Sequence, residues 1–322
     1  AVLIFVGIAT AAAAIFSPWG TSDPFKWTTN FGRDQDLLRL VTPGFNDCLQ
    51  YIQFVFLTGC LTLSYPGFYQ PAASNIGWSS LAFNESFVPG GHAQNALVDG
   101  IYHVNATYGM TRMTQYIGVA LPSDLFASMV VWLAVICGAA ILFCQSAFFI
   151  RWIYFRVSEN TQEDLRHKNW PLTGGMLVRV VFNYFMLPIV TIAMYQLLIA
   201  SQSRFYMVIV AVIVLAFIII LAAWILFVLI RTKPRSHLFD DLPTVLLYGS
   251  LYNTYNDERA LFAIIPVALT FIRGVAIGVV QPSGIAQIII LAICEVLFII
   301  AVHAARPFSS PTHMNVMHTI IS

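Results

Sequence analysis

Two side chains of opposite charge lie well inside apolar segments of this sequence. Arg273 lies in the run LTFIRGVAIG, and Glu295 lies in the run IIILAICEVLFIIAVHAA. A charge at the centre of a bilayer costs about 2.5–3.5 kcal/mol on insertion scales, so such residues usually have a partner or a function. The short connection VQPSG makes the segments antiparallel neighbours, and at a rise of 1.5 Å per residue Arg273 and Glu295 lie about 12 and 16 Å from it. We therefore predict that the two side chains form an ion pair.

Two roles fit this pair. As a structural clip it would hold two helices together, and as a gate or part of an ion or substrate pathway it would take part in transport. A satisfied pair leaves no free charge to bind anything, which favours the clip.

A second polar group interrupts the apolar segment 175–200. Proline removes a helical hydrogen bond, and membrane helices tolerate this where neighbouring side chains or water supply new partners. The pattern predicts either a bend that faces a cavity or a structural kink with hydrogen bonds between helices. The four residues that carry this prediction are Asn183, Pro188, Tyr195 and Gln196.

No motif for enzymatic chemistry accompanies these residues. The sequence has no HExxH, GxSxG or Walker motif and no catalytic carboxylate dyad, and its five cysteines lie in or beside apolar runs without CxxC spacing. We expect no enzyme, no disulfide and no bound cofactor, and the pattern indicates no particular metal ligand.

The composition indicates which elements position these side chains. Of 322 residues, 58% are hydrophobic and 10% are charged, whereas a soluble domain has about 25% charged residues. The sequence therefore predicts an all-α bundle of transmembrane helices. The net charge of +1 and the absence of a basic patch give no reason to expect nucleic acid. Seven segments approach the length of about 20 residues that crosses a bilayer, and they are 1–16, 49–63, 125–150, 175–200, 205–230, 261–280 and 285–305.

Charge asymmetry predicts the orientation of these spans. If the start of span 1 faces the lumen or exterior, the predicted loops 17–48, 151–174 and 231–260, together with Arg306, carry twelve Lys and Arg residues on the cytoplasmic side. The other side carries two. Its long loop, 64–124, contains the glycosylation sequons at Asn84 and Asn105, so we expect glycan there. Loop 17–48 is expected to lie at the membrane interface, and residues 306–322 to begin a further segment.

Two blocks of residues resemble one family. The first has Gln53, Phe54 and Gly59, then LSYP at 63–66, and Asn75 with Trp78; the second covers 247–308, with LYGSLYNTY, Arg273 to Gly278, Gly284, Gln287, Glu295 and RPF. Both are similar to the fungal TRP-like ion channel and flavin carrier family, and together they cover nearly thirty percent of the chain.

The resemblance implies a subunit of a membrane cation channel that moves calcium or other cations, with regulation by lipids or mechanical force. It also implies a homo-oligomer in the plasma membrane or endoplasmic reticulum. One alternative is a transporter of flavin or another solute, in which FAD would be cargo only. A seven-span receptor is a second alternative, which the topology alone permits.

Overall fold

The computed structural model describes residues 4, 8, 45–88, 97–98, 101–119, 121–158, 165–233, 237–255 and 257–307. Within them the chain is helical, apart from an antiparallel hairpin of two-residue strands, Leu97–Val98 (β1) and Ile101–Tyr102 (β2). The all-α prediction is confirmed. Apart from residues 4 and 8, predicted span 1–16 lies outside the described residues, as do most of loop 17–48 and residues 308–322.

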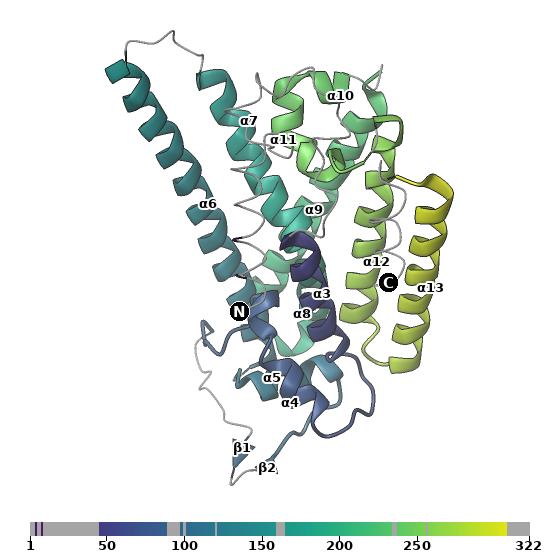
Figure 1. The fold of residues 1–322 in the computed structure, drawn as a ribbon. Coiled ribbons are helices and arrows are strands. Elements are labelled where there is room, and N and C mark those ends of the chain that lie inside the picture. The colour runs from purple at the N-terminus through teal and green to yellow at the C-terminus, as the bar shows by residue number, and fades with distance from the viewer. Residues whose placement is uncertain are drawn as a thin grey trace.

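Four long apolar helical stretches correspond to predicted spans 3, 5, 6 and 7. Figure 1 shows α12 and α13 side by side at one edge of the bundle and α6 at the opposite edge. Each stretch is long and apolar enough to cross a membrane. They are α6 (Pro122–Ser158), α9 (Phe205–Arg231), α12 (Ile264–Val279) with the preceding 3₁₀-helix Asp257–Ala263, and α13 (Gly284–Ala305).

The predicted span 175–200, in which a bend or kink was expected, corresponds to a broken helix. It consists of α7 (Leu165–Val178), a π-helix (Arg179–Tyr184) and α8 (Met186–Leu198), and it bends by 67° between Tyr184 and Met186. The described residues therefore hold four candidate spans, or five if the bent pair counts as one. Seven spans and their orientation stay a prediction.

The predicted span 49–63 forms a shorter helix, α3 (Phe45–Thr58), of 14 residues. A helix of this length extends about 21 Å, which is less than the hydrocarbon thickness of a bilayer. The apolar sequence continues past Thr58, but the backbone turns there. We use the name cap for the part that follows, which comprises α4 (Tyr69–Ser74), the 3₁₀-helix Gly77–Ser80, the β1–β2 hairpin and α5 (Gly109–Ile117).

Two short helices occupy the opposite end of the molecule, within the predicted loop 231–260. They are α10 (His237–Asp240) and α11 (Leu242–Tyr252), and Figure 1 shows them at the far end from the cap. The hydroxyl of Tyr252 donates a hydrogen bond to the carbonyl oxygen of Leu238, which ties α10 to α11. Burial raises the pKa of this hydroxyl, so it stays a neutral donor.

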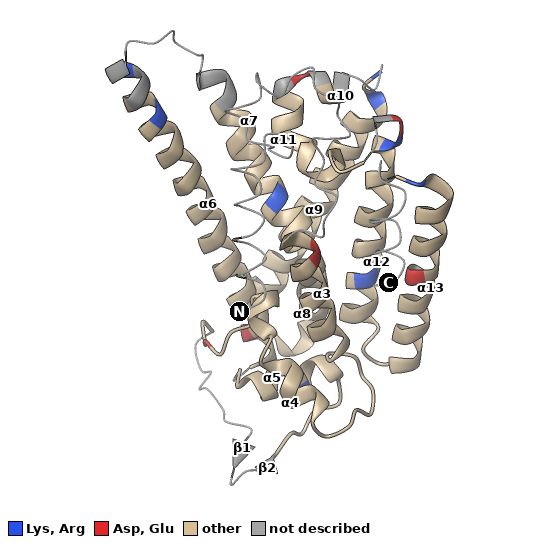
Figure 2. Cartoon of the chain, in the orientation of Figure 1, with Lys and Arg blue, Asp and Glu red and all other residues tan. Residues whose placement is uncertain are grey.

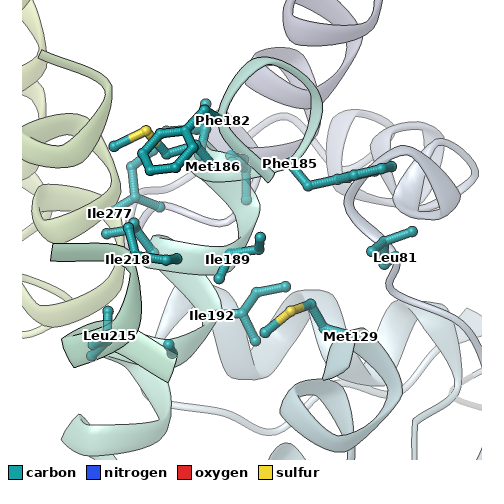
Figure 3. Close-up of a cluster of buried hydrophobic side chains, with 14 of the residues drawn as sticks. Leu81, Met129, Phe182, Phe185, Met186, Ile189, Ile192, Leu215, Ile218 and Ile277 are labelled. Atoms are coloured by element: carbon teal, nitrogen blue, oxygen red, sulfur yellow. The ribbon is translucent and has the colours of Figure 1, made fainter. Parts of the chain in front are cut away.

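Helix α8 lies at the centre of the core. Ile189, Ile192 and Ala193 are fully buried, and Figure 3 shows Ile192 beside Met129 of α6. On its other side α8 packs closely against α12, because a Cβ atom on Gly278 would lie 2.4 Å from the carbonyl oxygen of Thr191. Only glycine permits that approach.

Candidate functional site

The break between α7 and α8 follows from one proline. Pro188 lies in the first turn of α8 and has no N–H, so the carbonyl of Tyr184, four residues earlier, has no helical donor. The N–H of Phe185 bonds instead to the carbonyl of Val180, at 3.1 Å, in the five-residue spacing of a π-helix. Backbone carbonyls at the end of this π-helix therefore need partners from elsewhere.

Two glutamines of α3 supply these partners. The side-chain amide nitrogen of Gln53 donates to the carbonyl of Tyr184 and to the carbonyl of Ser79, both at 2.8 Å. The amide nitrogen of Gln50 donates to the carbonyl of Asn183 at 2.7 Å. Gln53 is fully buried, whereas Gln50 is exposed. We call this arrangement the capped break.

The capped break also contacts the end of the molecule opposite the cap. Asn183 donates from its side chain to the carbonyl of Ser250 in α11, at 2.8 Å. Helix α7 packs along α11, whereas α8 packs along α12. The break therefore lies where two packed helix pairs meet.

A third charged residue inside the apolar helices, in addition to Arg273 and Glu295, lies next to this break and was not among the predicted site residues. Arg179 begins the π-helix, within the apolar stretch Asn169–Tyr184. The predicted span starts at residue 175, which puts Arg179 close to its end, whereas the helix begins at Leu165. A continuous helix on both sides of a charged residue is the signal that could have found it.

The other two residues predicted for this helix lie about two turns farther along. Tyr195 is buried, and its hydroxyl is 2.7 Å from the hydroxyl of Thr111 in α5. Gln196 is fully buried, and neither polar atom of its side chain has a hydrogen-bond partner. The structure therefore places Asn183 and Pro188 at the break, and Tyr195 and Gln196 near the cap.

The structure also brings Arg273 and Glu295 together. A guanidinium nitrogen of Arg273 is 2.9 Å from a carboxylate oxygen of Glu295, and the two side chains are 18% and 19% exposed. Figure 2 shows one basic residue on α12 and one acidic residue on α13 at the same height. The guanidinium also lies over the ring of Phe298, 5.8 Å from its centroid. The choice between clip and gate stays a prediction.

A cluster of side-chain amides joins the turn that follows α3 to the α12–α13 hairpin. Gln281 accepts from the hydroxyl of Thr62 at 2.8 Å and donates to the carbonyl of Cys60 at 3.0 Å. Gln287 accepts from the N–H of Thr62, at 3.0 Å. A Cβ atom on Gly284 would lie 2.0 Å from the carbonyl oxygen of Thr62, so the backbones touch. Gly284 and Gln287 are among the residues that carry the family resemblance, whereas Gln281 is not and was not predicted to have a role.

Both predicted glycosylation sites lie on the cap. Asn84 and Asn105 are exposed, as a modified asparagine must be. Among the residues that the structure describes, no group of three His, Cys, Asp or Glu side chains could hold a metal ion.

The long apolar helices and the polar groups buried between them define an integral membrane protein with a polytopic helical fold. The sequence model of the transient receptor potential (TRP) ion channel family matches residues 91–322. That is more than two thirds of the chain, so the chain belongs to this family.

A fungal relative agrees with this membership. The chain is 30% identical over 335 residues to an uncharacterized membrane protein, C1322.03, of Schizosaccharomyces pombe. The alignment covers 99% of this chain and 38% of the relative, so the chain spans well under half of that protein's length. No solved structure matches the chain. The predicted resemblance to fungal TRP-like membrane proteins is confirmed.

Proposed function

We propose that this chain forms the membrane part of a cation channel and that the capped break is its hinge. The capped break carries the proposal: the carbonyls of Asn183 and Tyr184 accept hydrogen bonds from side chains of α3, and Pro188 leaves the carbonyl of Tyr184 without a helical donor. A broken helix inside a bilayer is costly unless neighbouring groups satisfy it. π-Helical turns inside α-helices are frequent at functional sites, which supports a role in motion.

The packing supports a specific movement. Helices α7 and α11 form one packed pair, and α8 and α12 form another. The π-helix between them contributes Val180 and Phe182 to the core, and Tyr184 at its end makes an edge-to-face contact with Phe45 at 5.6 Å. A rotation at Phe185 would move the α7–α11 pair against α8–α12 without unfolding either pair.

Single-channel recording tests this proposal. The purified protein in planar bilayers should give unitary cation currents, and Gln53→Leu should change the open probability more than the unitary conductance. Equal open probability in the parent and in a correctly folded Gln53→Leu protein would contradict the hinge. Calcium selectivity follows from reversal potentials in calcium and potassium gradients.

A solute transporter is the second candidate, because transporters build substrate sites from discontinuous helices near the bilayer midplane. The observation that favours it is the same break at Phe185. A transporter gives no unitary currents, but it gives saturable uptake of flavin or another solute into proteoliposomes.

The assembly and the site of action belong to the same proposal. We expect a homo-oligomer in the plasma membrane or endoplasmic reticulum, which particle images and fractionation of the natural host would test. Particle images in lipid nanodiscs that show single copies of the chain would contradict the oligomer.

A further inference from the structure

The two glycosylation sequons, residues 84–86 and 105–107, have different surroundings in the fold. An N-glycan is bonded to the side-chain nitrogen of the asparagine, and the sequon also requires the hydroxyl of the serine or threonine two residues later. The glycan itself is bulky and hydrophilic, so it needs open solvent around it. An occupied sequon therefore needs an asparagine amide with space beside it, and it has to lie clear of the lipid.

The side chains of the first sequon contact other parts of the fold. The hydroxyl of Ser86 donates to a carboxylate oxygen of Asp124, the third residue of α6, at 3.1 Å. The other carboxylate oxygen accepts from the N–H of Val88 at 2.8 Å, and Asp124 is fully buried. The side-chain amide of Asn84 lies against the end of α5, because a Cβ atom on Gly118 would be 3.0 Å from its nitrogen. The nitrogen that would carry a glycan is thus packed against backbone.

The first sequon also lies at the depth where lipid begins. The indole N–H of Trp132 donates to the carboxylate of Glu85 at 3.0 Å, and the rings of Phe83 and Trp132 are 4.9 Å apart. Trp132 is ten residues into α6 from Pro122, which is about 15 Å along the helix. From the neighbouring Val131 onward α6 has exposed apolar side chains. Since tryptophan concentrates at the headgroup level, this sequon lies in the headgroup layer.

The second sequon is held by its backbone and leaves its side chains in solvent. Asn105 and Thr107 are exposed, and within the described part of the chain neither side chain makes a hydrogen bond. Gln115 of α5 brackets Asn105, because it accepts from its N–H at 3.0 Å and donates to its carbonyl at 3.1 Å. Arg112 donates to the carbonyl of Ala106 at 3.1 Å. Figure 1 shows the preceding β1–β2 hairpin at the tip of the cap, away from the long helices.

We propose that Asn105 is the glycan acceptor of this chain, and that sequon 84–86 stays unmodified because it fixes the cap to α6. Glycans are added to the nascent chain before these contacts form. A glycan on Asn84 would later have to fit between the end of α5 and the headgroup layer, so a chain that carries one cannot bring Ser86 to Asp124. The assignment does not depend on whether the chain conducts ions.

Variants with one sequon removed test the assignment. The full-length parent, Asn84→Gln and Asn105→Gln are produced in the natural host, and the monodisperse membrane fraction is treated with a glycosidase that removes N-glycans. The parent and Asn84→Gln should show the same mass shift, that of one glycan, and Asn105→Gln should show none. Thr107→Ala keeps both asparagines and should match Asn105→Gln. A shift that persists in Asn105→Gln, or that is absent from the parent, would overturn the assignment.

A second measurement tests the structural role of the first sequon. Ser86→Ala removes the hydroxyl that bonds to Asp124, so it should lower the SDS concentration at the unfolding midpoint. Thr107→Ala is the matched change in the other sequon and should leave the midpoint where it is. All proteins are measured after glycosidase treatment, so that sugar does not contribute to the difference.

The conservative change Ser86→Thr keeps the hydroxyl and should restore the parent midpoint. If Ser86→Ala gives no folded protein, Glu85→Ala replaces it, because this change removes the acceptor of Trp132 and leaves the hydroxyl in place. Equal midpoints for the parent and the variant of the first sequon would show that sequon 84–86 does not fix the cap to α6, and would overturn that part of the proposal.

Discussion

The ion pair and the capped break keep polar groups inside a membrane in two different ways. Arg273 and Glu295 lie 22 residues apart on helices joined by a tight connection, and each neutralises the other. The carbonyl of Tyr184 relies on Gln53, which is 131 residues away in sequence. A local pair is stable wherever its hairpin forms, whereas the break is satisfied only when α3 is docked. The first arrangement suits a clip and the second suits a part that moves.

The largest expected effect comes from breaking the ion pair. Removing one partner of a buried pair typically costs about 3–5 kcal/mol, because it leaves a lone charge, whereas replacing both partners can be nearly neutral. Arg273→Leu or Glu295→Gln alone should lower the free energy of unfolding by about this amount. The double change Arg273→Leu with Glu295→Leu should recover most of it. Titration with SDS in mixed micelles measures the free energy of unfolding of the parent, the two single variants and the double variant.

Activity of the double variant then distinguishes clip from gate. A folded double variant with normal currents makes the pair a clip, and a folded but silent one makes it part of the gating or conduction machinery. Single variants as stable as the parent would show that the pair contributes nothing to folding.

The next largest effect concerns the capped break. Gln53→Leu removes the donor to two carbonyls, that of buried Ser79 and that of half-buried Tyr184. An unsatisfied buried acceptor costs about 1–3 kcal/mol, so we expect a loss of about 2–4 kcal/mol in the same titration. Gln50→Leu is the matched control, because Gln50 is exposed and its described backbone bond is to the single carbonyl of Asn183. A control that loses as much as Gln53→Leu would show that α3 packing, and not carbonyl capping, is responsible.

A smaller effect should come from restoring the helix's own donor. Pro188→Ala supplies an N–H four residues after Tyr184, and this N–H can donate to the carbonyl that Gln53 now satisfies. The change should therefore offset about 1 kcal/mol of the cost of Gln53→Leu. In the parent background it should alter gating more than yield. If the double variant is no more stable than Gln53→Leu alone, the proline is not what frees this carbonyl.

The same contrast explains what the sequence could predict. The ion pair could be predicted by counting residues from the tight connection between the two helices, because the helical rise per residue converts that count into a depth in the membrane. The bend in span 4 was predicted from Pro188. The side chains that donate hydrogen bonds to its backbone carbonyls, Gln50 and Gln53, could not be predicted, because they lie in a helix whose position depends on tertiary packing. Hydropathy also overestimated the length of α3. Residues 59–63 are mostly apolar, but they form a turn in which Thr62 donates hydrogen bonds to Gln281 and Gln287. Hydropathy indicates which segments avoid water, but it does not show where the backbone changes direction.

The smallest expected effect on stability comes from a test of the protein's orientation in the membrane. This orientation decides which side of the membrane each of the two regions lies nearer to. If the cap faces the lumen or exterior, the opposite end of the molecule, with α10 and α11, faces the cytoplasm. Asn84 and Asn105 are exposed on the cap, so at least one should carry glycan in the natural host. Replacing both by Gln should remove a glycosidase-sensitive mass shift and leave the unfolding titration unchanged, because neither side chain is buried. Labelling of a cysteine placed at either position by a membrane-impermeant reagent from the cytoplasmic side would reverse the orientation.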